Sequence, residues 1–208
     1  DEMHQNLTEL VEELNADAHY PKMFNKVFGR AVNQADIVKA IAQFERTLIS
    51  AHSKYDKYVR GEPGGEMNEN ELRGLRLAEQ FCFSCHATPL LTDNLYHNNG
   101  IDSDFTDDTE LMNKRGRARI TNNPDDLGKF KTPTLRNVEK TGPYMHDGRL
   151  ASLEQVIEHY SSGVLDSPTL DPLLKKNEKL GVPLSEAEKK QLIAFLKTLT
   201  DYEFLNDR

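Results

Sequence analysis

Two cysteines followed directly by a histidine constrain this chain more than any other feature of its sequence. The 208 residues include two cysteines, both within Phe81-Cys82-Phe83-Ser84-Cys85-His86. A disulfide between residues this close would close too small a loop to stabilise a fold appreciably. A structural zinc site needs two further thiolate or imidazole ligands at suitable spacing, and none is placed to complete it. A thioredoxin-like redox pair belongs beside a βαβ pattern, which this sequence lacks.

Cys-x-x-Cys-His is instead the attachment signature of a c-type haem. Two thiols on one helical turn can each add to one vinyl group of the same porphyrin, and the adjacent histidine is then directed at the iron. We therefore predict one haem c, bound covalently through Cys82 and Cys85, with His86 as the first axial ligand. Such haems are attached outside the cytoplasm in bacteria, so we expect an exported protein in the periplasm of a Gram-negative bacterium.

The charge balance disfavours one class of partner. Lys and Arg number 26 against 34 Asp and Glu, which gives a formal net charge of −8. Nucleic acid phosphates would be repelled, so small molecules or a cationic protein are the expected partners. No apolar run is long enough to predict a membrane span. The first residues lack the pattern of a signal peptide, so we expect a mature chain or a fragment.

Apolar residues recur at helical spacing in most of the chain, which predicts an all-α fold with unusually long loops. The segment 87–150 is rich in turn signals such as Asn-Asn-Gly and Asp-Gly and is expected to form these loops. The run Gly61–Gly65 is the expected linker. The predicted organisation is a helical extension with its linker over 1–66, a haem domain over 67–204 and a tail over 205–208. Helices are expected over 7–14, 37–48, 68–81, 152–160 and 185–196. Asn6 is the expected cap of the first helix, and capping boxes are expected at Asn68/Glu71, Ser152/Gln155 and Ser185/Glu188.

The second axial ligand of the iron is open on residue pattern alone. On a helix from Ser152, Tyr160 shares its face with Leu153 and Ile157, whereas His159 points about 100° away, toward the flank. A tyrosine on an apolar stripe is also a common packing residue. The downstream candidates are His97, Met112, Met145, His146, His159 and Tyr160.

Three further segments carry a family resemblance. They are Lys131-Thr-Pro-Thr-Leu-Arg-Asn-Val138, Thr141-Gly-Pro-Tyr-Met-His-Asp-Gly148 and Ser152-Leu-Glu-Gln-Val-Ile-Glu-His-Tyr160, and Ala40-Ile-Ala-Gln-Phe-Glu-Arg-Thr-Leu-Ile-Ser50 adds a fourth. With these motifs the chain resembles the C-terminal half of the bacterial dihaem cytochrome c peroxidases and of their relative MauG, the methylamine dehydrogenase maturation enzyme. The likeness extends over nearly the whole chain.

The resemblance implies a class I cytochrome c-like fold and a role in peroxide chemistry. Members of that family hold two c-type haems in two such domains. The N-terminal haem meets hydrogen peroxide, and the C-terminal haem relays electrons or holds oxidising equivalents. Because this chain has one attachment motif, its expected partners are a missing N-terminal haem domain and a small electron-donor protein or protein substrate. We expect the chain alone not to turn over peroxide.

The resemblance also implies roles for individual residues. The peroxidases have a methionine ligand fourteen residues after the histidine of Pro-Tyr-x-His, where MauG has tyrosine, and here that position is Tyr160. His146 then corresponds to a residue near the haem that is not its ligand. Glu2 corresponds to a glutamate that assists O–O cleavage, although it also fits an ordinary terminal carboxylate. Thr141 and Pro143 correspond to residues that bind calcium through backbone carbonyls.

Two arginines and two alternative functions complete the interpretation of the sequence. Arg117 and Arg136 are candidates for pairing with haem propionates, because guanidinium suits carboxylates, but they also fit ordinary surface charge. The alternative function is a monohaem electron-transfer protein without peroxide chemistry. It would dock a cationic partner through a loop that is otherwise simply solvated. The acidic residues of this loop are Asp102, Asp104, Asp107, Asp108 and Glu110. A third class of function is that of a structural module stabilised by its haem.

Overall fold

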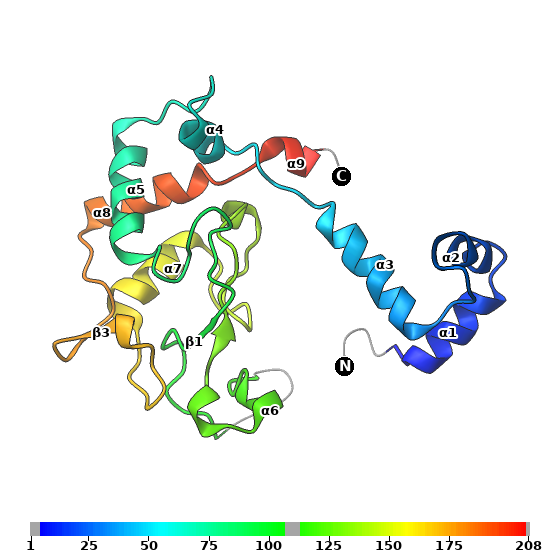
Figure 1. The fold of residues 1–208 in the computed structure, drawn as a ribbon. Coiled ribbons are helices and arrows are strands. Elements are labelled where there is room, and N and C mark those ends of the chain that lie inside the picture. Colours follow the sequence, from blue (N-terminus) through cyan, green and yellow to red (C-terminus); the bar gives the residue numbers. More distant parts are fainter. Residues whose placement is uncertain (1–4, 107–112, 207–208) are drawn as a thin grey trace. The chain divides into compact units, whose positions relative to one another are not determined.

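The computed structural model describes residues 5–106 and 113–206 and divides into two compact units, residues 1–49 and residues 50–208 (Figure 1). The expected boundary after residue 66 therefore differs from the observed one, and the Gly61–Gly65 run lies inside the second unit. The reason is tertiary packing of the segment before that run. The Tyr55 ring meets Phe195 edge-on at 5.5 Å between centroids, and the Tyr55 amide donates to the Thr198 carbonyl at 3.0 Å.

The first unit is helical and has a small core of its own. Its helices are α1 (Leu7–Ala16), α2 (Tyr20–Phe28) and α3 (Gln34–Arg46). Asn6 caps α1 as expected, because its side chain accepts the amide protons of Thr8 and Glu9. Phe24, Val32 and Ile37 form the buried centre of the unit. The helix predicted over 37–48 starts three residues earlier, because Asn33 supplies the cap, and it ends at Arg46.

The second unit is built on helices from both ends of its sequence. Its elements are α4 (Lys54–Arg60), α5 (Glu69–Phe81), β1 (Tyr96–His97), α6 (Ala118–Thr121), η2 (Pro124–Asp126), β2 (Phe130–Lys131), η3 (Val138–Lys140), α7 (Leu153–Glu158), η4 (His159–Gly163), η5 (Pro172–Leu174), β3 (Lys175–Lys176), β4 (Lys179–Leu180), α8 (Glu186–Lys197) and α9 (Tyr202–Asn206). The helices α5 and α8 pack directly against each other (Figure 1). Gly74 permits this close approach, because a Cβ there would lie 2.0 Å from the Gln191 carbonyl oxygen.

Sequence capping signals correctly located two of the three predicted capping boxes. Asn68 with Glu71 opens α5 and Ser185 with Glu188 opens α8, each with both reciprocal hydrogen bonds. At α7, Ser152 accepts the Gln155 amide proton, but the Gln155 side chain accepts from the Ala151 amide instead of closing the box. The predicted α-helix through Tyr160 ends at Glu158 and continues as a π-helical turn, η4.

The long loops between α5 and α7 are confirmed, and the fold is mainly helical as predicted, with two small sheets that the sequence did not indicate. Antiparallel pairs β1–β2 and β3–β4 form two small sheets, with Tyr96 opposite Lys131 in the first. Two-residue strands leave no periodic signal in a sequence, because alternation needs at least four residues to be visible. These strands link distant parts of the loops and so shape the walls of the site described below.

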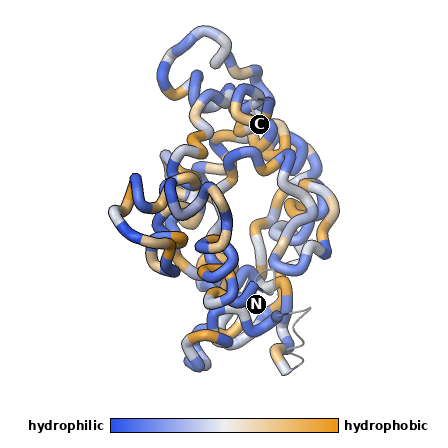
Figure 2. Tube along the Cα trace, turned by 90° about the vertical axis from the view of Figure 1, so that its right-hand side faces the viewer, coloured by the Kyte–Doolittle hydropathy of each residue, from blue (hydrophilic) through white to orange (hydrophobic). Residues whose placement is uncertain are grey.

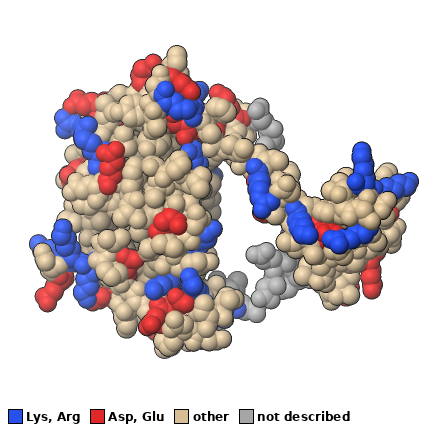
Figure 3. All heavy atoms as spheres, viewed as in Figure 1, with Lys and Arg blue, Asp and Glu red and all other residues tan. Residues whose placement is uncertain are grey.

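The core of the second unit lies between α5, α7 and α8. Ala78, Leu91 and Phe195 are fully buried in it. Figure 2 shows hydrophobic and hydrophilic stretches alternating over short distances along the chain. Over residues 5–106 and 113–206, none of the helices combines the length and hydrophobicity that crossing a bilayer requires. On the face shown in Figure 3, described residues of the second unit carry Lys and Arg interspersed with Asp and Glu.

Candidate functional site: an apolar cavity beside the two cysteines

A cavity that is partly open to solvent lies where α5, α7 and α8 meet the loops. Its wall is mainly aliphatic, with a few polar groups at defined places. Both cysteines, His86 and Tyr160 line it. The aliphatic wall includes Leu135, Val138, Leu153, Val156, Ile157 and Leu196. An apolar cavity with a few convergent polar groups is the usual form of a cofactor site.

The imidazole of His86 is oriented by two backbone carbonyls. Its Nδ1 lies 3.2 Å from the Leu91 carbonyl oxygen and 3.1 Å from that of Pro133. An Nδ1–H donated to these carbonyls fixes the tautomer and leaves the Nε2 lone pair free for a metal. Burial lowers the pKa of His86, which keeps the ring neutral and suited to coordination. Pro133 belongs to the Lys131–Val138 motif, so that motif supports the histidine through its backbone.

The two thiols are free and sit at the C-terminal end of α5. Cys82 is the C-cap residue of that helix, and its amide donates to the Ala78 carbonyl at 2.8 Å. The Cys85 amide in turn donates to the Cys82 carbonyl at 3.2 Å, so the two cysteines lie on one turn. Burial, together with the neighbouring Cys85, raises the pKa of Cys82 to about 12. Cys82 is therefore a neutral thiol at physiological pH.

Tyr160 reaches the cavity from the π-helical turn η4. Its hydroxyl oxygen lies 3.4 Å from Asn99 Nδ2. Burial raises the pKa of Tyr160, and the hydrogen bond from Asn99 opposes this. As expected, Tyr160 lines the cavity and His159 does not. His159 is nevertheless buried, and its Nε2 lies 3.0 Å from the Asn99 carbonyl oxygen.

The other ligand candidates are occupied by neighbouring groups. Met145 Sδ accepts from Asn99 Nδ2 at 3.2 Å. The ring of His146 stacks on Phe130 with 4.1 Å between centroids and an angle of 10°. Phe130 lines the cavity and His146 lies behind it, near Asp102 with 3.9 Å from Nε2 to the carboxylate. Met112 lies outside the described residues.

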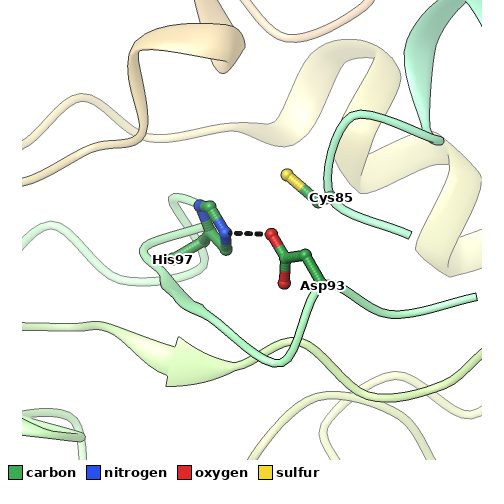
Figure 4. A group of neighbouring side chains, drawn as sticks. All are labelled: Cys85, Asp93 and His97. Carbon is green, nitrogen blue, oxygen red and sulfur yellow. Dashed lines mark hydrogen bonds and ion pairs between the residues drawn. The ribbon is translucent and has the colours of Figure 1, made fainter. Parts of the chain in front are cut away.

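His97 lines the cavity and lies beside Asp93 and Cys85 (Figure 4). Atoms of Cys85, Asp93 and His97 that could bind a metal lie within 4.8 Å of one another. However, Nε2 of His97 is 2.9 Å from Asp93 and Nδ1 is 2.5 Å from Asp171. Burial lowers the pKa of His97, but these two hydrogen bonds raise it overall. A ring that donates from both nitrogens has no lone pair for a metal, so this cluster is an ion-paired brace between β1 and η5.

Both candidate propionate partners have protein partners instead. The Arg136 guanidinium binds Asp56 in a bidentate pair, at 2.8 and 2.9 Å, and also donates to the backbone carbonyls of Ser50 and Pro89. Arg117 stacks on the Tyr96 ring at 4.4 Å, and its Nε lies 3.3 Å from Asp126. Neither side chain is among those lining the cavity. Surface charge does not describe Arg136 either, because its side chain is 16% exposed.

Several expected residues lie away from the cavity or outside the described part of the chain. Thr141 and Pro143 are on an exposed loop that follows η3. Glu2 lies outside the described residues, as do Asp107, Asp108 and Glu110 of the acidic loop. Asp102 of that loop is largely buried and bound by Arg149 at 3.0 Å, and Asp104 accepts hydrogen bonds from Thr106. Asp102 is therefore paired within the chain, whereas Asp104 remains exposed.

The cavity fits the covalent haem that the attachment motif predicts. Two free thiols, a tautomer-fixed imidazole and a tyrosine face one mainly apolar space, which is the donor set that such a group needs. Sequence reasoning missed the residues that hold this set in place, which are Leu91, Pro133 and Asn99. Two act through backbone carbonyls, which leave no sequence signal. Asn99 was visible only as part of a turn signal.

Comparisons with known proteins agree with the resemblance. A family model described as "Di-haem cytochrome c peroxidase" matches residues 1–64. The methylamine utilization protein MauG of Methylorubrum extorquens is 33% identical over 207 residues, covering 96% of this chain and 54% of that protein. The cytochrome c551 peroxidase of Nitrosomonas europaea is 37% identical over 184 residues, covering 87% of this chain and 49% of that protein.

The structural comparison points the same way. The crystal structure of a MauG-like protein associated with microbial copper homeostasis superposes with a TM-score of 0.76 at 34% identity, covering 96% of this chain and 63% of that chain. The chain spans about half the length of the curated relatives it matches. The resemblance seen in the motifs is thus confirmed, and the chain is homologous to the di-haem cytochrome c peroxidases and MauG over nearly its whole length.

Proposed function

We propose that residues 50–208 form the C-terminal haem domain of a periplasmic MauG-like or cytochrome c peroxidase-like oxidoreductase that reduces hydrogen peroxide. Haem c is the cofactor that homology to this family implies. One such group would be held in the cavity by thioether bonds to Cys82 and Cys85, with His86 and Tyr160 as axial ligands. The peroxide-binding haem would belong to a domain that this sequence does not include.

The chain's own residues would bind and tune the group. Cys82 and Cys85 would hold the group through thioether bonds, and His86 would bind its iron through Nε2, because Nδ1 is held by backbone carbonyls. The aliphatic wall excludes water from the ring faces. When bound, the group supplies one-electron chemistry that can be shared with a second haem. Because His86 and Tyr160 would both bind the iron, no site would be left there for peroxide, and the domain would serve to relay electrons or oxidising equivalents.

The observation that carries this proposal is that Tyr160 lines the same cavity as His86 and the two cysteines. An anionic phenolate oxygen favours the higher oxidation states of iron, whereas a thioether favours the ferrous state. Tyrosine ligation therefore suits a low-potential haem, as in MauG, better than the relay haem of a methionine-ligated peroxidase. The alternative is a monohaem electron-transfer protein without peroxide chemistry; in its acidic loop, Asp102 is bound by Arg149 and Asp104 is exposed.

The test is to replace Tyr160 by methionine and by phenylalanine in the haem-loaded chain. Tyr160→Met should raise the reduction potential, because a thioether stabilises ferrous iron. Tyr160→Phe should change the electron paramagnetic resonance spectrum, because one axial ligand is lost. A redox titration and the spectrum of each variant measure these effects.

A matched control is Tyr144→Phe. Tyr144 is also a partly buried tyrosine, but its hydroxyl donates to the Val138 carbonyl at 2.7 Å and it is not among the residues that line the cavity. This variant should leave potential and spectrum unchanged. If neither Tyr160 variant differs from the parent, Tyr160 is a packing residue, and the MauG-like ligand assignment is wrong.

A further inference from the structure

A turn outside all of the recognised motifs places an amide group against the tyrosine of the site. Asn98, Asn99 and Gly100 form this turn, which follows β1 directly. Asn99 lines the cavity, and its Nδ2 lies 3.4 Å from Tyr160 Oη and 3.2 Å from Met145 Sδ. One side chain therefore contacts both the phenolic oxygen of Tyr160 and the sulfur atom of Met145.

The orientation of the Asn99 amide is set by its surroundings. Its Oδ1 accepts the Ile101 amide proton at 3.3 Å, so the nitrogen and not the oxygen faces Tyr160. The Asn99 carbonyl oxygen accepts from His159 Nε2 at 3.0 Å. His159 directly precedes Tyr160 on η4. The η4 turn therefore binds the Asn99 backbone through His159, while the Asn99 side chain donates to the Tyr160 hydroxyl. This reciprocal arrangement also explains the burial of His159.

The turn itself is anchored independently of Asn99. Asn98 is buried, and its Nδ2 donates to the hydroxyl oxygens of Ser167 and Thr169, each at 3.0 Å. Its Oδ1 accepts the Gly100 amide proton at 2.9 Å. The turn thus has one asparagine that braces it and a neighbouring asparagine that faces the cavity, which separates a structural role from a tuning role.

We propose that Asn99 is a positioning residue for Tyr160, donating a hydrogen bond to the phenolic oxygen and thereby limiting how strongly this oxygen donates to the haem iron. The inference rests on the proposed function, because it assumes that Tyr160 is a ligand. Hydrogen bonds to an anionic oxygen are about twice as strong as neutral ones. Outer groups of this kind orient metal ligands and tune their basicity. Without the donor, the phenolate would stabilise ferric iron further and lower the reduction potential.

The experiment compares Asn99→Leu and Asn99→Ser with the parent haem-loaded chain. Leucine has a similar size but no donor. Serine can still close the turn with its hydroxyl but is too short to reach Tyr160. Both variants should lower the reduction potential. We expect the ferric to ferrous ratio at a fixed ambient potential to rise about tenfold, which corresponds to about 59 mV for one electron. The paramagnetic resonance signal of the ferric form should shift as well.

Two further variants make the result decisive. Asn98→Ala loosens the turn but keeps the Asn99 amide, so it should lower the potential by less than either Asn99 variant. In a Tyr160→Phe background, Asn99→Leu should have no additional effect. An unchanged or raised potential in both Asn99 variants, or an equal shift in Asn98→Ala, overturns the inference. If Tyr160→Phe alone alters nothing, the ligand assignment of the proposed function fails as well, whereas an effect of Tyr160→Phe without an Asn99 effect overturns the inference alone.

Discussion

The two ends of the ligand set in the cavity are built in different ways. The attachment side, Cys82 to His86, is contiguous in sequence and follows one helix end. The tyrosine side is assembled from Asn99, Met145 and Tyr160, which come from three separate segments. On the attachment side, chemistry fixes the residue types, because thioether bonds need two thiols at one spacing. On the tyrosine side, packing and hydrogen bonds decide which donor atom faces the cavity. The first side is therefore readable as a motif, and the second is open to tuning.

Removing the attachment cysteines should have the largest effect of any change in the site. In Cys82→Ala/Cys85→Ala, no thioether can form, so acid–organic extraction should release all of the haem. Intact-mass spectrometry under denaturing conditions should then give the bare polypeptide mass. The control is Ser84→Ala. Ser84 lies between the two cysteines and lines the same cavity, so this variant should keep the haem covalently bound. Tyrosine-side variants should keep it as well.

The predicted difference between cysteine variants and tyrosine-side variants is wrong if the parent chain, expressed with haem maturation, already shows the bare polypeptide mass. It also fails if a Tyr160 variant releases its haem as the double cysteine variant does. Either result would mean that the attachment side does not hold the cofactor covalently.

A large effect on stability is expected from the ion pair that braces the loops beside the attachment side. Asp56 is 7% exposed, and Arg136 also holds the Pro89 carbonyl, close in sequence to His86. Arg136→Leu leaves the buried carboxylate without its partner and should cost about 3 kcal/mol of unfolding free energy. Urea denaturation followed by circular dichroism measures this loss.

The matched control for this pair is Arg73→Leu. Arg73 pairs with Glu69 on the exposed face of α5, with side chains 53% and 76% exposed. Such pairs contribute about 0.5 kcal/mol or less. Equal losses in the two variants would show that the Asp56 pair does not brace the fold.

The smallest expected effect is the change with pH in the stability that the Asp56–Arg136 pair contributes. Burial tends to raise the pKa of Asp56, but hydrogen bonds from Arg136 and Ser53 lower it overall. The pKa of Asp56 in the folded chain is then below the unfolded value of about 3.9. The ion pair therefore contributes its full stability above about pH 3.9, and this contribution is lost as the pH falls through the pKa of Asp56 in the folded chain.

Comparison with Asp56→Asn isolates this contribution. The difference in urea midpoint between the parent and Asp56→Asn should be constant from about pH 7 to pH 5 and should narrow below about pH 4. A difference that stays constant into the acid range would show that Asp56 does not titrate with a lowered pKa in the folded chain.

Local signals in the sequence predicted the features that depend on neighbouring residues. The caps at Asn6, Asn68 and Ser185 were correct because a capping bond spans only two or three residues. The strands β1 and β2 were missed because each has two residues and gains its partner from a distant loop. The segment 50–66 was assigned to the linker because nothing local indicates that Tyr55 packs on Phe195.

The sequence by itself determined the attachment motif and, through the family resemblance, the position of Tyr160. Only the tertiary structure decided that Arg136 binds Asp56, that His159 is buried and that Asn99 faces the phenol. The physical reason is the range of the interactions. Covalent attachment and capping fix residue types at short, set spacings, whereas a carbonyl or an amide that supports a ligand can come from any segment that the fold brings near. Pro133 and Leu91 support His86 through backbone atoms common to all residues, so no sequence pattern could have identified them.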